Sequence, residues 1–332
     1  MNNKKNQVNK KKAIVIVGTT ASGKTALAVD LACKFNGEVV SADSRQVYKH
    51  MDIGTGKDLA EYTIKSEIGN RKSEITIPYH LIDVVHPNVP FDLAKWLDGA
   101  KLALKDICAR EKLPVIAGGT GLYVQALVDG FNLSSQGEDK ELRLELEKKN
   151  KEELFNMLLD LDEKFANKLN NSERNNKRRL IRYIEINKQG EMIKDNGLKK
   201  NNEYEYLIIG IEWPREIIKE RIHKRLIDRL EKEDMVGEVV RLHDEEKVSW
   251  KRLESFGLEY KFIAQYLQKK FTYDEMVEKL DIASGQYAKR QMTWLRRWEK
   301  QGTKIFWINN KEEAQDMVKD FVHCLDKNKE KC

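Results

Sequence analysis

The sequence predicts an α/β fold in which a mainly parallel sheet is covered by helices and an all-helical lobe is inserted. Short apolar runs of strand type alternate with helical patterns along the first part of the chain, as they do in parallel sheets with helices on both faces. A glycine-rich segment separates the first strand-like run from the first helical pattern. Residues 131–203 carry helical patterns only, which predicts the lobe.

The composition agrees with a folded protein of this size. The chain has 332 residues, of which 40% are hydrophobic and 34% charged, so a fibrous or wholly disordered chain is excluded. No apolar run approaches the roughly 18 residues that a membrane span needs, and we expect a cytoplasmic protein without membrane contact. The cysteines stand far apart and lack zinc-ligand spacing, so no disulfide framework or zinc module is expected; they are Cys33, Cys108, Cys324 and Cys332.

The first elements form a strand, a glycine loop and a helix. The apolar run Ala13–Val17 leads into Gly18–Thr25, which fits the pattern G-x-x-x-x-G-K-[ST], and a helical pattern follows. In this context the pattern predicts a phosphate-binding loop (P-loop), so the core is expected to be a P-loop core. We expect Lys24 and the loop to bind a diphosphate and Thr25 to hold Mg²⁺. The expected diphosphate-binding residues of the loop are Gly18, Thr20, Ala21, Ser22, Gly23, Lys24 and Thr25.

Two further segments are expected beside this loop. The predicted strand at 38–42 runs into Asp43, and the predicted strand at 113–117 runs into Gly118–Gly121, which contains Thr120. Ligands of open α/β sheets bind at the carboxyl ends of the strands, so both segments should face the P-loop. Position alone leaves two roles open for Asp43. It could act in catalysis, or it could merely order the loop or ligate the metal through water. The glycine segment could equally be an ordinary tight turn.

The remaining elements complete the predicted domain organisation. Further strands are expected at 79–83, 206–211 and 304–308, with helices at 92–110 and from Pro214, where proline is well tolerated, to about Gln301. We therefore expect a disordered basic tail at 1–12, a core made of 13–130 and 204–332, and the helical lobe at 131–203.

The net charge of +6 is mild, but the positive charge is clustered. The runs are Lys4–Lys12, Arg174–Arg182 and Lys289–Trp298, and the last interleaves arginine with tryptophan. Such a surface suits a polyanion with exposed rings or sugars, although a solvated helix face over core tryptophans would give the same pattern. A row of arginines, Arg221, Arg225 and Arg229, borders an apolar helix stripe and could reach a bound anion.

Several segments together resemble the tRNA dimethylallyltransferase (isopentenyl-tRNA transferase) family of bacterial type. The matching stretches are Gly18–Thr25, Ser41–Lys49, Met51–Lys57, Tyr79–Asp83, Ala117–Tyr123 and Ala288–Arg296. The resemblance implies transfer of a dimethylallyl group from dimethylallyl diphosphate to the exocyclic amine of the adenosine just 3′ of a tRNA anticodon, with release of diphosphate. It implies two partners, the anticodon stem-loop of tRNA and dimethylallyl diphosphate, and we expect a monomer.

The resemblance also implies roles for individual residues. Asp43 matches the general base, Thr120 the residue that helps to hold the flipped adenine, and Arg225 a diphosphate ligand. The matching tRNA contacts are Asp43, Ser44, Arg45, Gln46, Thr120, Arg143, Arg178, Arg179, Leu180, Ile181, Arg182 and Arg290. The chain departs from the family pattern at Thr19, where proline is frequent, in a longer segment at 59–78, and at 171–176.

Two other functions use some of the same features. A small-molecule P-loop kinase would bind ATP at the glycine loop and close a lid over the phosphates, but it would not need the basic runs. An RNA-binding protein that hydrolyses nucleotides would use the basic runs but would leave Asp43 without a task. Prenyl transfer uses all of these features.

Overall fold

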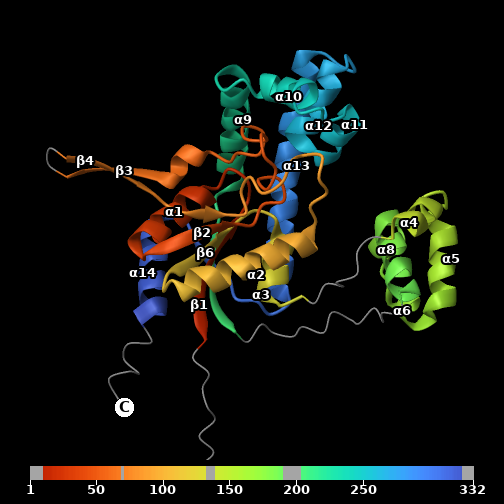
Figure 1. Cartoon of the computed structure of the whole chain (residues 1–332), viewed down its shortest axis with the longest axis horizontal. Helices are drawn as coiled ribbons and strands as arrows, with labels where there is room; N and C mark the ends of the chain where they lie inside the picture. The colour runs from red at the N-terminus through yellow and green to blue at the C-terminus, as the bar shows by residue number, and fades with distance from the viewer. Residues whose placement is uncertain (1–9, 69–70, 132–138, 190–202, 324–332) are drawn as a thin grey trace, which may run out of the picture. The chain divides into compact units, whose positions relative to one another are not determined.

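The computed structural model describes residues 10–68, 71–131, 139–189 and 203–323. The chain divides into two compact units, one made of Met1–Val128 with Asn201–Cys332 and the other of Asp129–Lys200 (Figure 1). We call the first the core and the second the lobe, and each is described by itself.

The core is built on a sheet of six strands in the order β5-β2-β6-β1-β7-β8. All neighbouring strands pair in parallel, which confirms the predicted mainly parallel sheet. The central strand β1 has its middle residues fully buried, as expected for a strand covered on both faces. The strands are β1 (Lys11–Gly18), β2 (Gly37–Ser41), β5 (Tyr79–His80), β6 (Leu113–Ala117), β7 (Tyr204–Ile211) and β8 (Phe306–Ile308).

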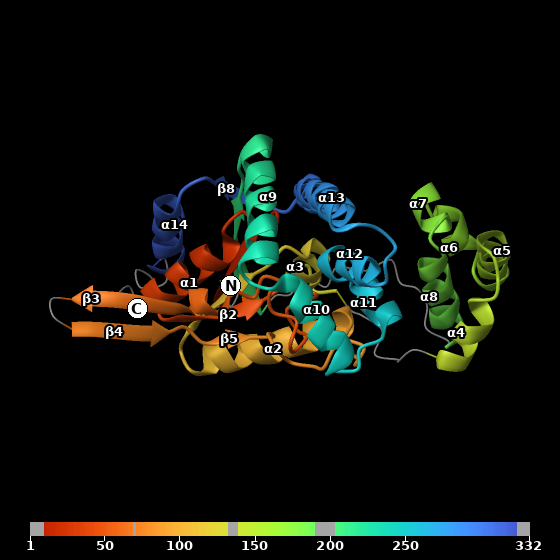
Figure 2. The same cartoon turned by 90° about the horizontal axis from the view of Figure 1, so that it is seen from above.

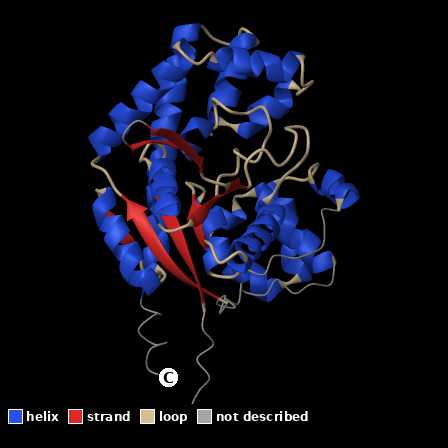
Figure 3. Cartoon of the chain, turned by 60° about the vertical axis from the view of Figure 1, so that its left-hand side comes forward, coloured by secondary structure: helices blue, strands red, loops and turns tan. Residues whose placement is uncertain are grey.

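Helices cover both faces of this sheet (Figure 3). Helices α1 (Lys24–Lys34) and α14 (Lys311–His323) contact each other and the strands on one side, while α2 (Leu93–Ala109) and α3 (Gly121–Val128) pair on the other. Asp92 caps α2 by accepting a hydrogen bond from the Lys95 N–H at 3.0 Å, as an N-cap carboxylate does. The sheet is therefore buried between two helical layers.

The rest of the core consists of helices and one hairpin that the sequence did not predict. Helix α9 (Arg215–Glu231) begins directly after Pro214, as predicted, and α10 (Met235–Asp244), α11 (Trp250–Phe256), α12 (Leu258–Leu267) and α13 (Tyr273–Lys300) follow. After the short 3-10 helix η1 (Leu59–Tyr62), β3 (Thr63–Ile68) and β4 (Arg71–Thr76) form a separate antiparallel sheet (Figure 2). This hairpin is too polar to show an apolar alternation.

The lobe is entirely helical within the described residues. It contains α4 (Lys140–Leu146), α5 (Lys151–Leu161), α6 (Glu163–Lys168), α7 (Asn171–Arg174) and α8 (Lys177–Lys188). Its small core includes Leu146, Leu154 and Leu158. Asn150 begins α5 with a capping box, in which its side chain and Glu153 satisfy each other's backbone N–H groups.

Three expectations about individual segments need correction. Lys11 and Lys12 belong to β1 rather than to a basic tail, and residues 1–9 of that tail lie outside the described residues. The strand expected at 79–83 ends at His80, because Leu81 and Asp83 have φ values of 63° and 55°, which a strand does not permit. The strand expected at 304–308 begins only at Phe306.

The expectations about the cysteines and about membrane contact can be compared with the structure only for the residues that it describes. Cys33 is exposed and Cys108 half-buried, and both are free thiols, while Cys324 and Cys332 lie outside the described residues. Among the helices described, none combines the length with the apolar composition that crossing a membrane requires.

One buried charge cluster stabilises the start of β2. Glu38 lies within the sheet with a side chain that is 2% exposed, and its carboxylate receives hydrogen bonds from Arg110 and from Lys112, the latter at 2.8 Å. His80 on the neighbouring strand lies 2.8 Å from the same carboxylate. Arg110 above all, together with Lys112 and His80, holds the pKa of Glu38 far below its usual range against the opposing effect of burial.

We expect Glu38→Gln to lower the free energy of unfolding at pH 7 by about 1–3 kcal/mol, because hydrogen bonds to an ionised group are lost. In the parent, Glu38 stays ionised in the folded state while the unfolded chain takes up a proton near pH 4.5, so this stabilisation declines as the pH falls. The gap between parent and variant should therefore narrow below about pH 4.5. Urea unfolding at pH 7 and pH 4 measures it, with the exposed Glu111→Gln as control; a gap that does not change with pH would contradict the account.

Candidate active site

The parallel register brings three loops to one edge of the sheet. Ala117 of β6 pairs with Ile16 of β1 on one side and with Ser41 of β2 on the other. The loops that leave these strands are Gly18–Gly23, Ala42–Gln46 and Gly118–Thr120, and they carry the residues singled out in the sequence. The expected meeting of the P-loop, Asp43 and Thr120 at the carboxyl edge is thus present in the structure.

The P-loop has the geometry of an anion-binding loop. Gly23 has a φ of 91° and precedes α1, so the first free N–H groups of that helix point toward the loop. The Lys24 ammonium donates to the Thr19 carbonyl at 2.5 Å and thus lies across the loop. The hydroxyl of Ser22 is buried and has no hydrogen-bond partner among the described residues. A bound phosphate group would supply acceptors for these donors.

Two cations stand close together at this loop. Arg225 of α9 donates a hydrogen bond to the Thr20 hydroxyl. Burial, and next the charge of Arg225, lower the pKa of Lys24 to about 8, while the charge of Asp43 acts in the opposite direction. Burial and the neighbouring Arg229 lower the pKa of Arg225 to about 10. Mutual repulsion of buried cations favours the binding of an anion between them.

Asp43 and Thr120 are connected through the turn that follows β2. One Asp43 carboxylate oxygen accepts from the Arg45 N–H at 2.8 Å, which orders the turn, and the Ser44 N–H donates to the Thr120 hydroxyl at 3.3 Å. Arg45 in turn donates to the Phe256 carbonyl at 2.9 Å. A carboxylate, a hydroxyl and the P-loop lysine therefore share one site.

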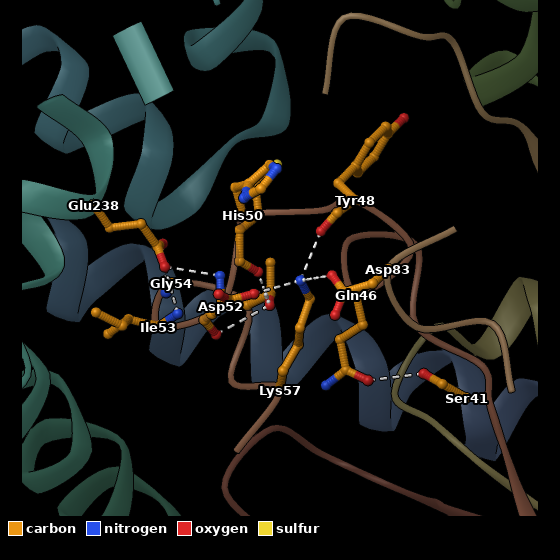
Figure 4. A network of polar contacts seen from close by, with 12 residues as sticks. Ser41, Gln46, Tyr48, His50, Asp52, Ile53, Gly54, Lys57, Asp83 and Glu238 are labelled. Atoms are coloured by element: carbon orange, nitrogen blue, oxygen red, sulfur yellow. Dashed lines mark hydrogen bonds and ion pairs between the residues drawn. The ribbon is translucent and has the colours of Figure 1, made fainter. Parts of the chain in front are cut away.

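The segment after this turn is held by a buried lysine (Figure 4). The Lys57 side chain is completely buried, and its ammonium donates to the Tyr48 carbonyl at 2.7 Å, to Asp52 at 2.6 Å and to Asp83. Because three oxygens surround the ammonium, its charge is compensated without water.

The same close-up shows the hydrogen bond between Gln46 and Ser41 (Figure 4). The Gln46 side-chain amide donates to the Gly56 carbonyl at 3.0 Å and accepts from the Ser41 hydroxyl at 2.8 Å. The amide thus ties the turn after β2 both to the strand and to the segment that Lys57 holds. Both polar ends of Gln46 are engaged within the core in this structure.

Glu238 of α10 fixes the other side of the segment. Its carboxylate accepts from the N–H groups of Asp52 at 2.7 Å, Ile53 at 2.6 Å and Gly54 at 3.1 Å. The Tyr260 hydroxyl also donates to the Glu238 carboxylate, at 2.8 Å, and both side chains are buried. The sequence analysis missed both Lys57 and Glu238; the stretch Met51–Lys57 belonged to the resemblance, but nothing in Glu238 itself pointed to this role.

Helix α13 reaches the site with a residue that the sequence analysis did not single out. The Gln291 side chain accepts from the Thr20 N–H at 2.7 Å and donates to the Gly119 carbonyl at 2.8 Å. Tyr287 of the same helix lies close enough to Thr120 for the two side chains to interact. Helix α13, which carries the late run of arginine and tryptophan, therefore contacts both the P-loop and the loop of Thr120.

The site suits a divalent cation that binds mainly to its ligand. The protein offers the Thr25 hydroxyl at the start of α1 and the Asp43 carboxylate opposite the loop, and no cluster of three or more metal-ligating side chains exists among the described residues. Mg²⁺ is held in this manner, by one or two protein oxygens together with phosphate oxygens and water. The donor set therefore fits Mg²⁺ bound together with a diphosphate.

The arginines expected to contact tRNA in the lobe fall into two groups. Glu185, which is fully buried, accepts two hydrogen bonds from Arg143, at 2.6 and 2.8 Å, and one from Arg182 at 3.2 Å. Arg178 and Arg179 are exposed on α8, with Arg179 3.7 Å from Glu173. The first group is held in a buried ion-pair cluster, and the second faces solvent.

Two residues of the lobe that were expected to contact tRNA have buried side chains. Leu180 is fully buried and Ile181 is 5% exposed, and both pack in the hydrophobic core of the lobe. Helical periodicity explains the difference, because α8 turns these positions inward between the exposed arginines. Their side chains therefore stabilise the lobe.

The residues of the late basic run also have different surroundings. Trp298 is 1% exposed and belongs to the core, and Arg296 pairs with Glu212 at 2.6 Å and with Glu299 at 2.9 Å. Arg290 is exposed, with its guanidinium 5.9 Å from the ring of Tyr287. Arg290 therefore remains available for an anion, whereas Arg296 serves the fold.

Comparisons with known proteins assign these features to a family. Residues 46–298 match the family model described as IPP transferase, and residues 11–67 match the one described as Isopentenyl transferase. Among curated proteins, "tRNA dimethylallyltransferase 1" of Syntrophus aciditrophicus is 41% identical over 90% of this chain and 93% of its own length. "tRNA dimethylallyltransferase 2" of Treponema denticola is 43% identical over 90% of this chain and 96% of its own.

Solved structures give the same result. The tRNA isopentenylpyrophosphate transferase of Bacillus halodurans is 33% identical, with a TM-score of 0.64 over 97% of this chain and 99% of that one. A eukaryotic dimethylallyltransferase, solved as snapshots of its action on tRNA, is 26% identical with a TM-score of 0.75 over 94% of this chain and 80% of that one. All the segments of the candidate site lie within residues 11–298, which the two family models cover together.

We expect Lys57→Met to lower the free energy of unfolding by about 1–3 kcal/mol, because methionine fills the space but leaves the Tyr48 carbonyl without its donor. Asp52 and Asp83, with side chains 58% and 35% exposed, can turn to water, which limits the loss. Urea unfolding and limited proteolysis of the segment 50–58 measure the effect. The exposed Lys49→Met is the matched control, and equal stability of the two variants would show that the buried ammonium contributes nothing.

Proposed function

The chain belongs to the IPP transferase family, and we propose that it prenylates tRNA by moving the dimethylallyl group of dimethylallyl diphosphate to the exocyclic N6 amine of the adenosine directly 3′ of the anticodon. Diphosphate is the second product. Family membership favours this reaction over a small-molecule kinase and over an RNA-binding protein that hydrolyses nucleotides, because its relatives are named for the transfer.

One observation carries the chemistry: a carboxylate lies beside a loop built to hold a diphosphate. The turn of Asp43 and the P-loop leave neighbouring parts of the sheet at the same edge, and Asp43 is close enough for its charge to act on the Lys24 ammonium. Thr120 is tied to the turn of Asp43 through the Ser44 N–H. Such a pair of groups can accept a proton from one substrate while the loop holds the leaving group of the other.

The transfer balances as a single substitution. The adenine N6 atom forms a bond to the allylic carbon of dimethylallyl diphosphate, the carbon–oxygen bond to the diphosphate breaks, and the amine proton passes to the Asp43 carboxylate. A proton acceptor is needed because an exocyclic amine is a poor nucleophile. Thr120 holds the extruded adenine, which must leave its stack to reach the allylic carbon.

The P-loop stabilises the departing diphosphate. Negative charge accumulates on it as the carbon–oxygen bond breaks, and the loop N–H groups, Lys24 and Arg225 meet that charge where it develops. The diphosphate-binding residues proposed are Gly18, Thr20, Ala21, Ser22, Gly23, Lys24, Thr25 and Arg225. When bound, Mg²⁺ would be held by Thr25 and would neutralise part of the same charge.

We propose that tRNA binds through the turn Asp43–Gln46, Thr120, Arg290 and the exposed arginines of the lobe. Arg178 and Arg179 project from α8 into solvent, where phosphate groups can reach them. Arg143 and Arg182 contribute through the cluster around Glu185, which restricts their geometry. The reaction would take place in the cytoplasm, with the protein acting as a monomer.

A transfer assay tests the proposed function. The full chain is incubated with Mg²⁺, unmodified tRNA and radiolabelled dimethylallyl diphosphate, or with ATP in its place. Label in the RNA, located on the adenosine next to the anticodon after nuclease digestion, is the expected result. Transfer of phosphate from ATP, or hydrolysis of ATP without labelled RNA, would overturn the proposal.

We expect Asp43→Ala to lower turnover by roughly 10²–10⁴-fold, the contribution of a lost general base. Binding of tRNA and of dimethylallyl diphosphate should stay within about threefold, because the proton acceptor acts mainly in the transition state. Single-turnover rates at saturating substrate and separate binding titrations measure the two effects. Near-normal turnover would remove Asp43 from the mechanism.

We expect Lys24→Ala and Arg225→Ala both to weaken binding of dimethylallyl diphosphate, with Lys24 the more damaging because the loop closes around its ammonium. The effects should not add fully, since both charges serve one leaving group. Isothermal titration of the single variants and the double variant gives the coupling energy. Unchanged affinity in both single variants would contradict the placement of the diphosphate.

We expect the double variant Arg178→Gln, Arg179→Gln to weaken tRNA binding and to flatten the slope of log affinity against log salt by up to about 2 units, one for each phosphate that is no longer neutralised. Affinity for dimethylallyl diphosphate should not change. The control is Lys151→Gln, Lys164→Gln, which removes the same charge from exposed positions elsewhere in the lobe. Equal behaviour of the two double variants would mean that the arginines act only through net charge.

A further inference from the structure

One amide joins the two loops that hold the reacting groups. The Gln291 side chain of α13, 7% exposed, accepts from the Thr20 N–H of the P-loop at 2.7 Å. Its NH₂ group donates to the Gly119 carbonyl, in the loop of Thr120, at 2.8 Å. The two loops follow β1 and β6 and are far apart in the chain. Gln291 joins them directly through its two hydrogen bonds.

The chemistry of the two contacts requires an amide. A backbone N–H can only donate and a backbone carbonyl can only accept, so the orientation of the Gln291 amide follows from its partners. A carboxylate at this position could accept from Thr20 but would repel the Gly119 carbonyl. An apolar side chain of the same length could do neither. Glutamine alone among side chains of this length bridges both loops.

Helix α13 approaches the loop of Thr120 closely because glycines occupy the points of contact. A Cβ atom on Gly119 would overlap the Gln291 amide nitrogen, and one on Gly121 would overlap the Trp294 ring. Side chains at these positions would therefore push α13 away from the loop. The glycines serve the contact with α13 as much as any contact with a ligand.

The neighbours of the two contacts are the residues of the proposed reaction. Arg225 donates to the hydroxyl of the same Thr20, and the Lys24 side chain passes 3.7 Å from the Cβ position of Gly119. Tyr287, one helical turn before Gln291, lies close enough to Thr120 for the two side chains to interact. The amide thus stands between the diphosphate side and the adenine side of the site.

We propose that Gln291 is a positioning residue, which holds the P-loop and the loop of Thr120 at a fixed separation so that the allylic carbon and the attacking amine meet in line. This inference rests on the proposed function. A transfer between two bound substrates is sensitive to their spacing, and a displacement of about 1 Å can cost about 100-fold in rate. Gln291 touches neither reacting atom in this role and acts through the two loops.

The test compares Gln291→Met with Gln286→Met, which removes an exposed glutamine from the same helix. Gln291→Met should lower kcat by about 10–100-fold and leave KM for tRNA and for dimethylallyl diphosphate within about threefold. Gln286→Met should behave as the parent. A kcat within threefold of the parent, or a rise in KM with kcat unchanged, would overturn the proposal.

A double-mutant cycle with Thr120→Ala separates positioning from general stabilisation. If Gln291 acts through the loop of Thr120, the loss of kcat in the double variant should be smaller than the product of the single losses. Fully multiplicative losses would overturn the proposal. Gln291→Glu, which keeps the acceptor for Thr20 and loses the donor for Gly119, should reproduce the fall in kcat and replaces Gln291→Met if that variant does not fold.

A binding measurement distinguishes failure of this inference from failure of the proposed function. Titration with inorganic diphosphate reports the P-loop without any transfer, and Gln291→Met should bind it within about threefold of the parent, because the anion-binding donors of the loop remain. If the parent binds diphosphate but transfers nothing, the proposed function fails. If the parent transfers and Gln291→Met transfers equally well, only the inference fails.

Discussion

The parallel register of β2, β6 and β1 is the constraint on which the site depends. Ala117 pairs with both Ser41 and Ile16, so the three strands end together and their loops leave at one edge. A shift of one residue in either pairing would turn the alternating side chains to the opposite face and displace a loop by a full residue. Because the strands are buried on both faces, the apolar cores above and below the sheet prevent such a shift.

The cations at this edge of the sheet differ from the paired charges elsewhere in the core. Lys24 and Arg225 are each destabilised as cations by burial and by a cationic neighbour, which lowers both pKa values. Elsewhere in the core, Glu38 pairs closely with Arg110 and Lys57 with Asp52. Neighbouring half-buried cations with lowered pKa values are typical of sites that receive an anion.

The segment that follows the turn of Asp43 illustrates what the sequence alone could not reveal. Met51–Lys57 was recognisable as part of the family pattern. However, Lys57 donates a hydrogen bond to Asp83, and Glu238 accepts from three backbone N–H groups of this segment. Both contacts join residues that are far apart in the chain. Local patterns do not encode such partners. The hairpin of β3 and β4 was missed for a related reason, because it pairs with itself outside the main sheet and shows no apolar alternation.

The sequence by itself determined the α/β class, the P-loop and the positions of Asp43 and Thr120, because glycine spacing, apolar periodicity and order along the chain are local properties. Arg225 was distinguished from Arg221 and Arg229 only by the family resemblance. Only the tertiary structure decided which members of a basic run face solvent. Arg178 is exposed, Leu180 and Ile181 are in the core of the lobe, and Arg143 lies against Glu185. It also decided that Gln291 joins two loops, since a hydrogen bond between distant segments exists only once the chain has folded.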